Sequence, residues 1–267
     1  MALSVPLLLL AGLGLVSALM VALWFWQRAH RDAGIVDAGW AFALGLLAVL
    51  YAAAQPAAGP RAALVAAVAA LWSWRLAWHL LTDRVIGKPE DGRYQALRAQ
   101  WAPHEQRAFF AFFQAQAVAA VLFSLPFLAG MSAGRSGPRP IGAWDVAACA
   151  VWLIAFAGEV GADAQLAAWR GDPANRGRTC RNGLWAWSRH PNYFFEWLYW
   201  WTYVLFAIGT HYAALTLIAP AVMLFLLFRV TGIPTTEARA LLSRGDDYRD
   251  YQRNTSVFVP LPPRGRS

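Results

Sequence analysis

Long apolar runs separated by short charged segments constrain this chain more than any other feature. A helix needs about 20 apolar residues to cross the hydrocarbon of a membrane. Runs of this kind cover 2–26, 34–54, 62–82, 108–130 and 143–165, and Gly209-Thr210-His211 divides a longer stretch into 193–209 and 211–230. We therefore predict an all-α fold, an integral membrane bundle of seven transmembrane helices. It forms one domain over 1–267, with a cytoplasmic loop and tail as a cap.

Composition excludes most other classes of protein. Charged residues make up 14% of the chain and hydrophobic residues 58%, whereas a soluble domain carries about 25% charged residues. An ordinary soluble enzyme, a disordered chain and a disulfide scaffold are excluded. The net charge of +8 is read as a signal of membrane topology, with membrane lipids as partners and no nucleic acid.

The arginines predict the orientation. Nineteen Lys and Arg residues lie in 27–33, 83–107, 166–192 and the C-terminal tail, against Arg61, Arg135 and Arg139 on the other side. Cytoplasmic loops carry the excess of positive charge. We expect the N-terminus outside and the C-terminus in the cytoplasm, in a multi-pass protein of a bacterial inner membrane.

Several ionisable residues lie inside the predicted spans, where each costs roughly 2.5–3.5 kcal/mol on insertion scales. They are Asp37, Arg75 with His79, Glu159, Asp163 and Glu196. With the predicted orientation, all fall in the cytoplasmic half of the bilayer, which favours a shared polar cavity open to the cytoplasm. The alternative is that they reach the interface or tie helices together through ion pairs.

The segment 166–196 combines five arginines with glycine turns and aromatic rings. Arginine binds phosphate with two parallel hydrogen bonds and also stacks on aromatic planes. The segment therefore suits a phosphate-bearing ligand with a stackable base, although a basic loop can also meet anionic lipid headgroups. The histidines show no paired metal-ligand spacing, so we predict no metal site.

The stretch Ser188-Arg-His-Pro-Asn-Tyr-Phe-Phe-Glu196 resembles the signature of the steroid 5α-reductase family, in its bacterial branch. The resemblance extends to 35–40, 74–94, 159–170, 182–185 and 232–251. It implies a seven-helix membrane enzyme that uses NADPH to reduce a C=C bond conjugated to a 3-oxo group. The implied substrate is a steroid or terpenoid-like lipid.

The resemblance also implies site residues. It places NADPH against Arg75, Glu159, Asp163, Arg170, Asn192, Tyr193 and Glu237; their chemistry and nearness add Arg178, Arg189, His190 and Tyr251. Asp37 matches the acid that polarises the 3-oxo oxygen, and burial would favour the protonated form that this role needs. Trp72 stands near the place where the mammalian enzymes have a second donor, a tyrosine.

Two other functions remain open from the residues alone. A membrane methyltransferase of the isoprenylcysteine or phospholipid type carries a similar R-H-P-x-Y element at its S-adenosylmethionine site. The arginine-rich loop and the Asp163/Arg170 pair suit a ligand with phosphates, and S-adenosylmethionine has none. A transporter or lipid-binding bundle would place polar groups in both halves of the membrane, whereas here they fall in one.

Overall fold

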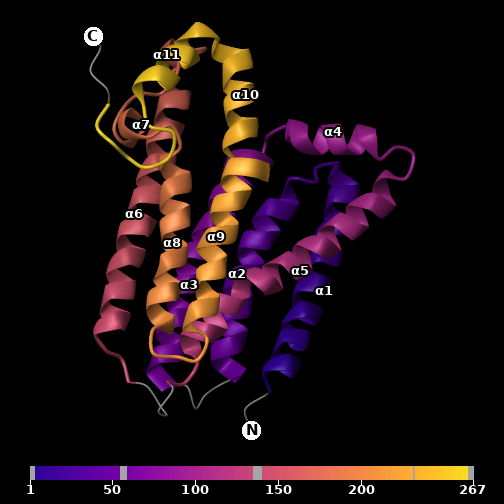
Figure 1. Cartoon of the computed structure of the whole chain (residues 1–267). Helices are drawn as coiled ribbons and strands as arrows, with labels where there is room; N and C mark the ends of the chain where they lie inside the picture. The colour runs from indigo at the N-terminus through magenta and orange to yellow at the C-terminus, as the bar shows by residue number, and fades with distance from the viewer. Residues whose placement is uncertain (1–3, 55–58, 135–139, 231, 264–267) are drawn as a thin grey trace. The chain divides into compact units, whose positions relative to one another are not determined.

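The computed structural model describes residues 4–54, 59–134, 140–230 and 232–263 (Figure 1), and within these ranges it is nearly all helical, without strands. Tertiary contacts group the chain into two compact units. Unit 1 comprises Met1–Ile141 and Gly209–Tyr212, and unit 2 comprises Gly142–Ile208 and Ala213–Ser267. Each unit is described by itself.

Unit 1 is built from long helices around a packed apolar centre. Its elements are α1 (Val5–His30), α2 (Ile35–Ala54), α3 (Gly59–Leu80), the π-helical turn η2 (Leu81–Val85), α4 (Gly92–Gln100) and α5 (Glu105–Met131). Helix α2 packs against α3, and both α1 and α2 pack against α5. The side chains of Leu44, Leu47, Trp72 and Phe113 are fully buried in this unit.

Unit 2 is organised around the pair α6 and α8. Its elements are α6 (Ala143–Gly171), η3 (Pro173–Asn175), α7 (Leu184–Trp187), α8 (Pro191–Ala207), η4 (Ala213–Leu217), α9 (Ile218–Phe225), η5 (Leu226–Val230), α10 (Ile233–Arg244) and α11 (Asp246–Asn254). Helix α8 packs against both α6 and α9. At Gly158 of α6, an added Cβ would lie 2.4 Å from the ring of Phe195, so the small residue permits the close approach of these helices.

Six helices within the described residues are long and apolar enough to cross a membrane. They are Val5–His30, Ile35–Ala54, Gly59–Val85, Glu105–Met131, Ala143–Gly171 and Ala213–Arg244. They coincide with six of the seven predicted runs and fit a multi-pass membrane protein. The predicted run 193–209 forms α8, which has 17 residues. At 1.5 Å per residue, α8 is about 26 Å long, slightly shorter than the hydrocarbon core of about 30 Å.

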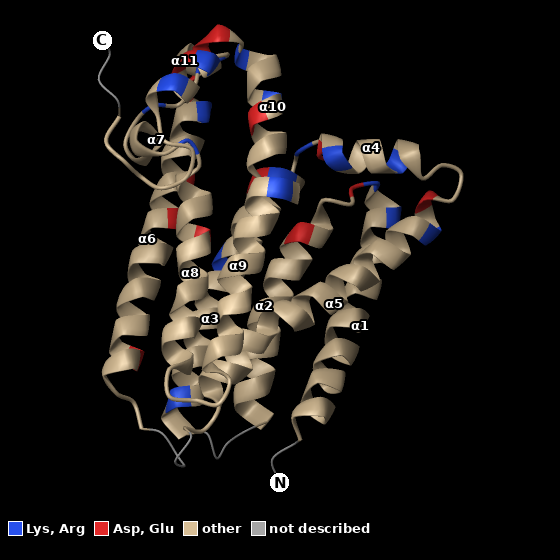
Figure 2. Cartoon of the chain, in the orientation of Figure 1, with Lys and Arg blue, Asp and Glu red and all other residues tan. Residues whose placement is uncertain are grey.

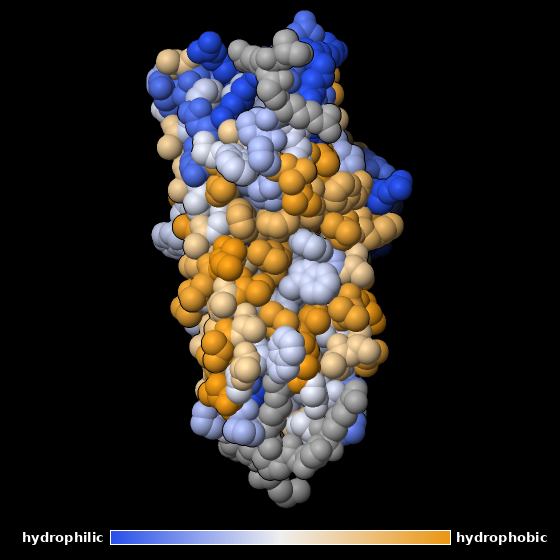
Figure 3. All heavy atoms as spheres, turned by 60° about the vertical axis from the view of Figure 1, so that its left-hand side comes forward, coloured by the Kyte–Doolittle hydropathy of each residue, from blue (hydrophilic) through white to orange (hydrophobic). Residues whose placement is uncertain are grey.

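The surface of these helices is apolar, as a lipid environment requires. Leu10, Leu122 and Val146 are among the large hydrophobic residues whose side chains are exposed. Figure 3 shows hydrophobic side chains over much of the visible face. The outward-facing residues therefore have the character of lipid-facing side chains.

Charged residues gather at one end of the helices within each unit (Figure 2). In unit 1 most of them surround α4 and the adjoining helix ends, with Arg61 at the opposite end of α3. In unit 2 most lie around α10 and α11, with acidic residues also along α6 and Asp145 in its first turn, at the opposite end. This one-ended distribution is what the arginine count predicts within each unit. Arg135 and Arg139 lie outside the described residues.

The close approach at Gly158 predicts a packing defect in a Gly158→Ala variant. The new methyl group would meet the body of the Phe195 ring, and overpacking of this kind costs about 1–3 kcal/mol. We expect a lower thermal unfolding midpoint in detergent. The matched control is Gly161→Ala on the same helix, where the nearest atom lies 3.8 Å away. A Gly158→Ala midpoint equal to or above that of Gly161→Ala would contradict this account of the packing.

Candidate functional site

Asp37 lies at the first turn of α2, in a cluster of polar side chains within unit 1. Its Oδ1 accepts a hydrogen bond from the Tyr94 hydroxyl at 2.6 Å, and its Oδ2 accepts one from Arg93 Nη2 at 3.0 Å. Arg84 Nη1 lies 3.8 Å from the same Oδ2. The carboxylate therefore has two guanidinium groups and a phenol around it.

The local sequence explains how Arg93 and Tyr94 reach Asp37. Asp91 caps α4, because its side chain accepts a hydrogen bond from the backbone N–H of Arg93 at 2.8 Å. Glu90 Oε1 accepts a hydrogen bond from the backbone N–H of Ala33 at 2.8 Å, and this contact fastens the start of α4 to the start of α2. The turn before α4 thus presents two consecutive side chains to the acid.

Tyr94 is a site residue that the sequence analysis missed. It is 3% exposed, and burial, with a further contribution from the Asp37 carboxylate, raises the pKa of its phenol. Tyr94 is therefore a protonated hydrogen-bond donor at neutral pH. Trp72, the residue expected near this role, is fully buried in α3, and Arg75 lies half-buried one turn further along the same helix.

Helices α6 and α8 bring together the predicted polar residues of unit 2. Asn192 Nδ2 donates a hydrogen bond to Asp163 Oδ1 at 3.3 Å. Glu159, one turn before Asp163, is 3% exposed. The Tyr193 ring stacks on His190 at 5.3 Å with an interplanar angle of 6°. The sequence placed these residues in one site, and the structure joins Asp163 and Asn192 directly.

The turn before α7 is held against α6 by a specific set of contacts. Gly183 has φ +56°, a left-handed conformation that favours glycine, and the next backbone N–H, that of Leu184, donates to Gln165 Oε1 at 2.8 Å. Trp185 Nε1 donates to the carbonyl of Ala162 at 2.9 Å. These contacts fix the segment that leads into α8.

Arg189, His190 and Glu237 interact with one another. Glu237 Oε1 accepts a hydrogen bond from Arg189 Nε at 2.7 Å and lies 3.2 Å from His190 Nε2, and Glu237 Oε2 accepts one from Gln252 at 2.7 Å. Arg189 Nη1 also donates to the carbonyls of Gln252 and Thr255, both at 2.9 Å. The Arg189 guanidinium thus ties the start of α8 to α10 and to the tail.

Tyr251 completes this attachment of the tail. Its hydroxyl donates to the carbonyls of Trp185 and Ser188 at 2.5 and 3.1 Å. Burial raises the pKa of Tyr251, so the phenol remains a donor. The Ser188 hydroxyl donates to the carbonyl of Phe258 at 2.8 Å. In the structure, Tyr251 therefore contacts backbone carbonyls.

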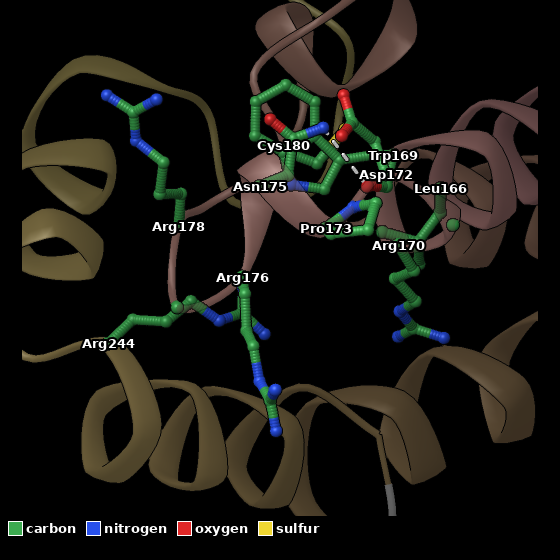
Figure 4. A pocket seen from close by; sticks show the side chains of 12 residues that line it. Leu166, Trp169, Arg170, Asp172, Pro173, Asn175, Arg176, Arg178, Cys180 and Arg244 are labelled. Carbon is green, nitrogen blue, oxygen red and sulfur yellow. Dashed lines mark hydrogen bonds between the residues drawn. The ribbon is translucent and has the colours of Figure 1, made fainter.

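A cavity of about 420 Å³ lies at the end of α6, within unit 2 (Figure 4). Arg170 and Arg178, both predicted site residues, line it. Arg176 and Arg244 line it as well, and the sequence analysis did not select them. The available signal for Arg176 was its place among the five arginines of the segment 166–196. Arg244 had no such signal, because it comes from the far end of α10.

The predicted site residues thus divide between the units. Asp37, Trp72 and Arg75 belong to unit 1, and the other predicted contacts belong to unit 2. A single cavity shared by all of them stays a prediction. Over the described ranges, no group of three or more His, Cys, Asp or Glu residues is arranged to hold a metal ion.

Comparison with known protein families gives a match over most of the chain. The family model described as "Protein of unknown function (DUF1295)" matches residues 23–255. The chain belongs to the DUF1295 family. This family is linked to steroid 5α-reductase-like membrane proteins. No curated protein and no solved structure matches the chain. The matched region of this DUF1295 protein contains the Asp37 cluster, the α6–α8 contacts, the arginine-lined cavity and Tyr251.

The Arg189–Glu237 pair predicts a stability difference between two carboxylate variants. The side chains of Arg189 and Glu237 are 11% and 15% exposed, so Glu237→Gln leaves a largely buried guanidinium without its counter-charge, at a cost of about 3–5 kcal/mol. The control is Asp246→Asn, which breaks a pair whose side chains are 61% and 94% exposed and costs less than about 1 kcal/mol. SDS titration in mixed micelles measures both free energies of unfolding. Equal losses would contradict the role of Glu237 as the partner of Arg189.

Proposed function

We propose that this protein is a membrane-embedded oxidoreductase that uses NADPH to reduce the C=C bond of a lipid enone, such as the C4=C5 bond of a 3-oxo-Δ4 steroid. The observation that carries the proposal is the arrangement of unit 2. Asp163 of α6 binds Asn192 of α8. Two turns further along α6, Arg170 lines the arginine-lined cavity.

The donor set in unit 2 fits a dinucleotide phosphate. Guanidinium groups bind phosphate oxygens in pairs of hydrogen bonds, and four arginines line the cavity. The apolar side chains of Leu166 and Trp169 line it as well, and an aromatic wall suits a base or ribose. Within unit 2, Asp163, Asn192, Tyr193, Glu159, Arg170 and Arg178 are proposed to hold NADPH. Contact of Arg75 with NADPH stays a prediction of the sequence.

The structure suggests a different task for Arg189, His190, Glu237 and Tyr251. Arg189 and His190 both bind Glu237, and Arg189 also donates to the tail carbonyls of Gln252 and Thr255. Tyr251 donates to the carbonyls of Trp185 and Ser188, next to the start of α8. We propose that these four residues position the start of α8 rather than donate to the cofactor. This revises the direct NADPH contacts that the resemblance and nearness implied for them.

When bound, NADPH supplies the hydride for the β-carbon of the enone. Negative charge then develops on the 3-oxo oxygen, and donors fixed in advance stabilise it most effectively. Asp37, Tyr94 and Arg93 form such a group in unit 1. We propose that Asp37 holds Tyr94 and Arg93 in place, and that a proton shared by Asp37 and Tyr94 is donated to the oxygen. The α-carbon then takes a proton from water as the oxygen returns its proton to the pair, which gives the saturated ketone.

The topology belongs to the same proposal. We propose that α8 is a seventh crossing, short because its first turn begins at Pro191 among the polar groups of the site. With seven crossings, the charged ends that hold α4 and α11 face the cytoplasm, and the N-terminus lies outside. The membrane is proposed to be a bacterial inner membrane.

NADPH oxidation by the purified, detergent-solubilised protein tests this function. With progesterone or testosterone, we expect consumption of NADPH and a product two mass units heavier than the substrate, by mass spectrometry. Tight NADPH binding without turnover would point to another lipid enone as the substrate. Binding of S-adenosylmethionine, with no affinity for NADPH, would overturn the proposal in favour of a methyltransferase.

The Asp37 cluster predicts two variants with lower turnover. Asp37→Asn and Tyr94→Phe each remove part of the shared proton donor, and loss of one such donor typically lowers kcat by about 10²–10³-fold. NADPH affinity should stay unchanged. The control is Lys88→Gln, an exposed residue in the same loop. Full activity of Tyr94→Phe would remove Tyr94 from the mechanism.

A further inference from the structure

The arginine-lined cavity of unit 2 is built from three separate segments. Arg170 comes from the end of α6, Arg176 and Arg178 from the loop around η3, and Arg244 from the end of α10. Figure 4 shows the side chains of Arg170, Arg176 and Arg244 extending into the space between the loop and α10, with Arg178 on the other side of the loop. Its volume of about 420 Å³ lies within the range of small-molecule sites, about 300–1,000 Å³.

The lining of this cavity contains more basic than acidic residues. Asp172 is the one acidic residue in its lining, against four arginines, and its Oδ1 accepts a hydrogen bond from the backbone N–H of Ala174 at 2.9 Å. Within the described part of the chain, no carboxylate forms an ion pair with Arg176, Arg178 or Arg244. Like charges held together this way repel one another, and a bound anion relieves the repulsion.

Arg181, in the same loop, forms ion pairs with two carboxylates of α11. Its Nη2 lies 2.9 Å from Asp247 Oδ1 and its Nη1 lies 2.7 Å from Asp250 Oδ2. Burial opposes the ionisation of Asp247, but the hydrogen bonds from Thr179 and Arg181 hold its pKa below the usual value. The nearby acids of α11 are therefore engaged with Arg181, and Arg176 and Arg178 are left for another anion.

Arg244 is oriented by an aromatic contact. Its guanidinium carbon lies 5.6 Å from the centroid of the Tyr248 ring, a cation–π distance. This contact orients the Arg244 guanidinium but does not neutralise its positive charge. A doubly charged phosphomonoester balances several unpaired arginines better than a singly charged diester does, and it offers more oxygens for their paired hydrogen bonds.

We propose that this cavity is a phosphomonoester site in which Arg176 and Arg244 are specificity-determining residues. On the proposed function, on which this identification rests, the phosphomonoester is the 2′-phosphate of NADPH. The cavity then distinguishes NADPH from NADH, with Arg170, Arg176 and Arg244 as the arginines that extend into it, and Arg178 lines it from the other side of the loop. The wall formed by Leu166 and Trp169 faces the adenosine.

Binding of nucleotide fragments to the full-length protein in detergent tests this inference without an activity assay. By isothermal titration calorimetry, we expect adenosine 2′,5′-bisphosphate to bind the wild type at least about tenfold more tightly than 5′-AMP, as the loss of one charge-assisted contact implies. Arg176→Gln and Arg244→Gln should each remove most of that difference and leave 5′-AMP binding unchanged. The control is Arg249→Gln, an exposed arginine outside the cavity, and thermal midpoints check that every variant is folded.

The outcomes separate this inference from the proposed function. Equal binding of the two fragments, or variants with wild-type affinity, would overturn the phosphomonoester site even if NADPH-driven reduction is observed. Arginine-dependent binding of the bisphosphate without reduction of any enone would keep the site and remove the reductase. Phosphatidic acid in the micelle supplies the same chemistry from a lipid. Displacement of the bisphosphate by this lipid, with no effect of NADPH, would overturn the nucleotide assignment.

Discussion

Charged side chains are poorly solvated in a membrane, and this constraint determines where they lie in this protein and which groups they bind. An ionisable side chain within a spanning helix is stable only when protein groups or water replace its hydration. Asp37 at the start of α2 receives hydrogen bonds from Arg93 and Tyr94, and Asp163 in α6 receives one from Asn192. Within each unit, most of the charged groups lie at one end of the helices, with Arg61 and Asp145 at the other end. The chemistry is therefore expected at those ends, while the remaining helix surface faces lipid.

The apolar runs predicted the long helices well, because hydrophobic length is a local property of the sequence. Six predicted runs coincide with candidate spans. The seventh run forms the 17-residue α8, and its crossing of the membrane is a proposal. Helix α4 was missed because it is short and polar. Its position depends on the cap at Asp91 and on the contact between Glu90 and Ala33, and neither follows a periodic pattern.

Which side chains the charged residues bind was harder to predict than which charged residues lie near the site. The sequence grouped Arg189, His190, Glu237 and Tyr251 with the cofactor site. The structure joins Arg189 and His190 to Glu237, and Tyr251 to backbone carbonyls. Arg244 was not selected because α10 brings it to the cavity from far along the chain. Tyr94 was not selected because its contact with Asp37 depends on how the turn before α4 is folded. Each of these contacts is decided by tertiary structure.

The central proposal, that the chain transfers hydride from NADPH to a lipid enone, is supported by the arginine-lined cavity and the Asp37 cluster. Isotope transfer tests this claim most directly. The purified protein would be supplied with NADPH that carries deuterium at C4 on the transferred face, together with progesterone, and the product would be analysed by NMR. The account predicts one deuterium at the β-carbon of the former enone, C5 of the steroid. A reduced product without deuterium from either face of the nicotinamide would contradict it.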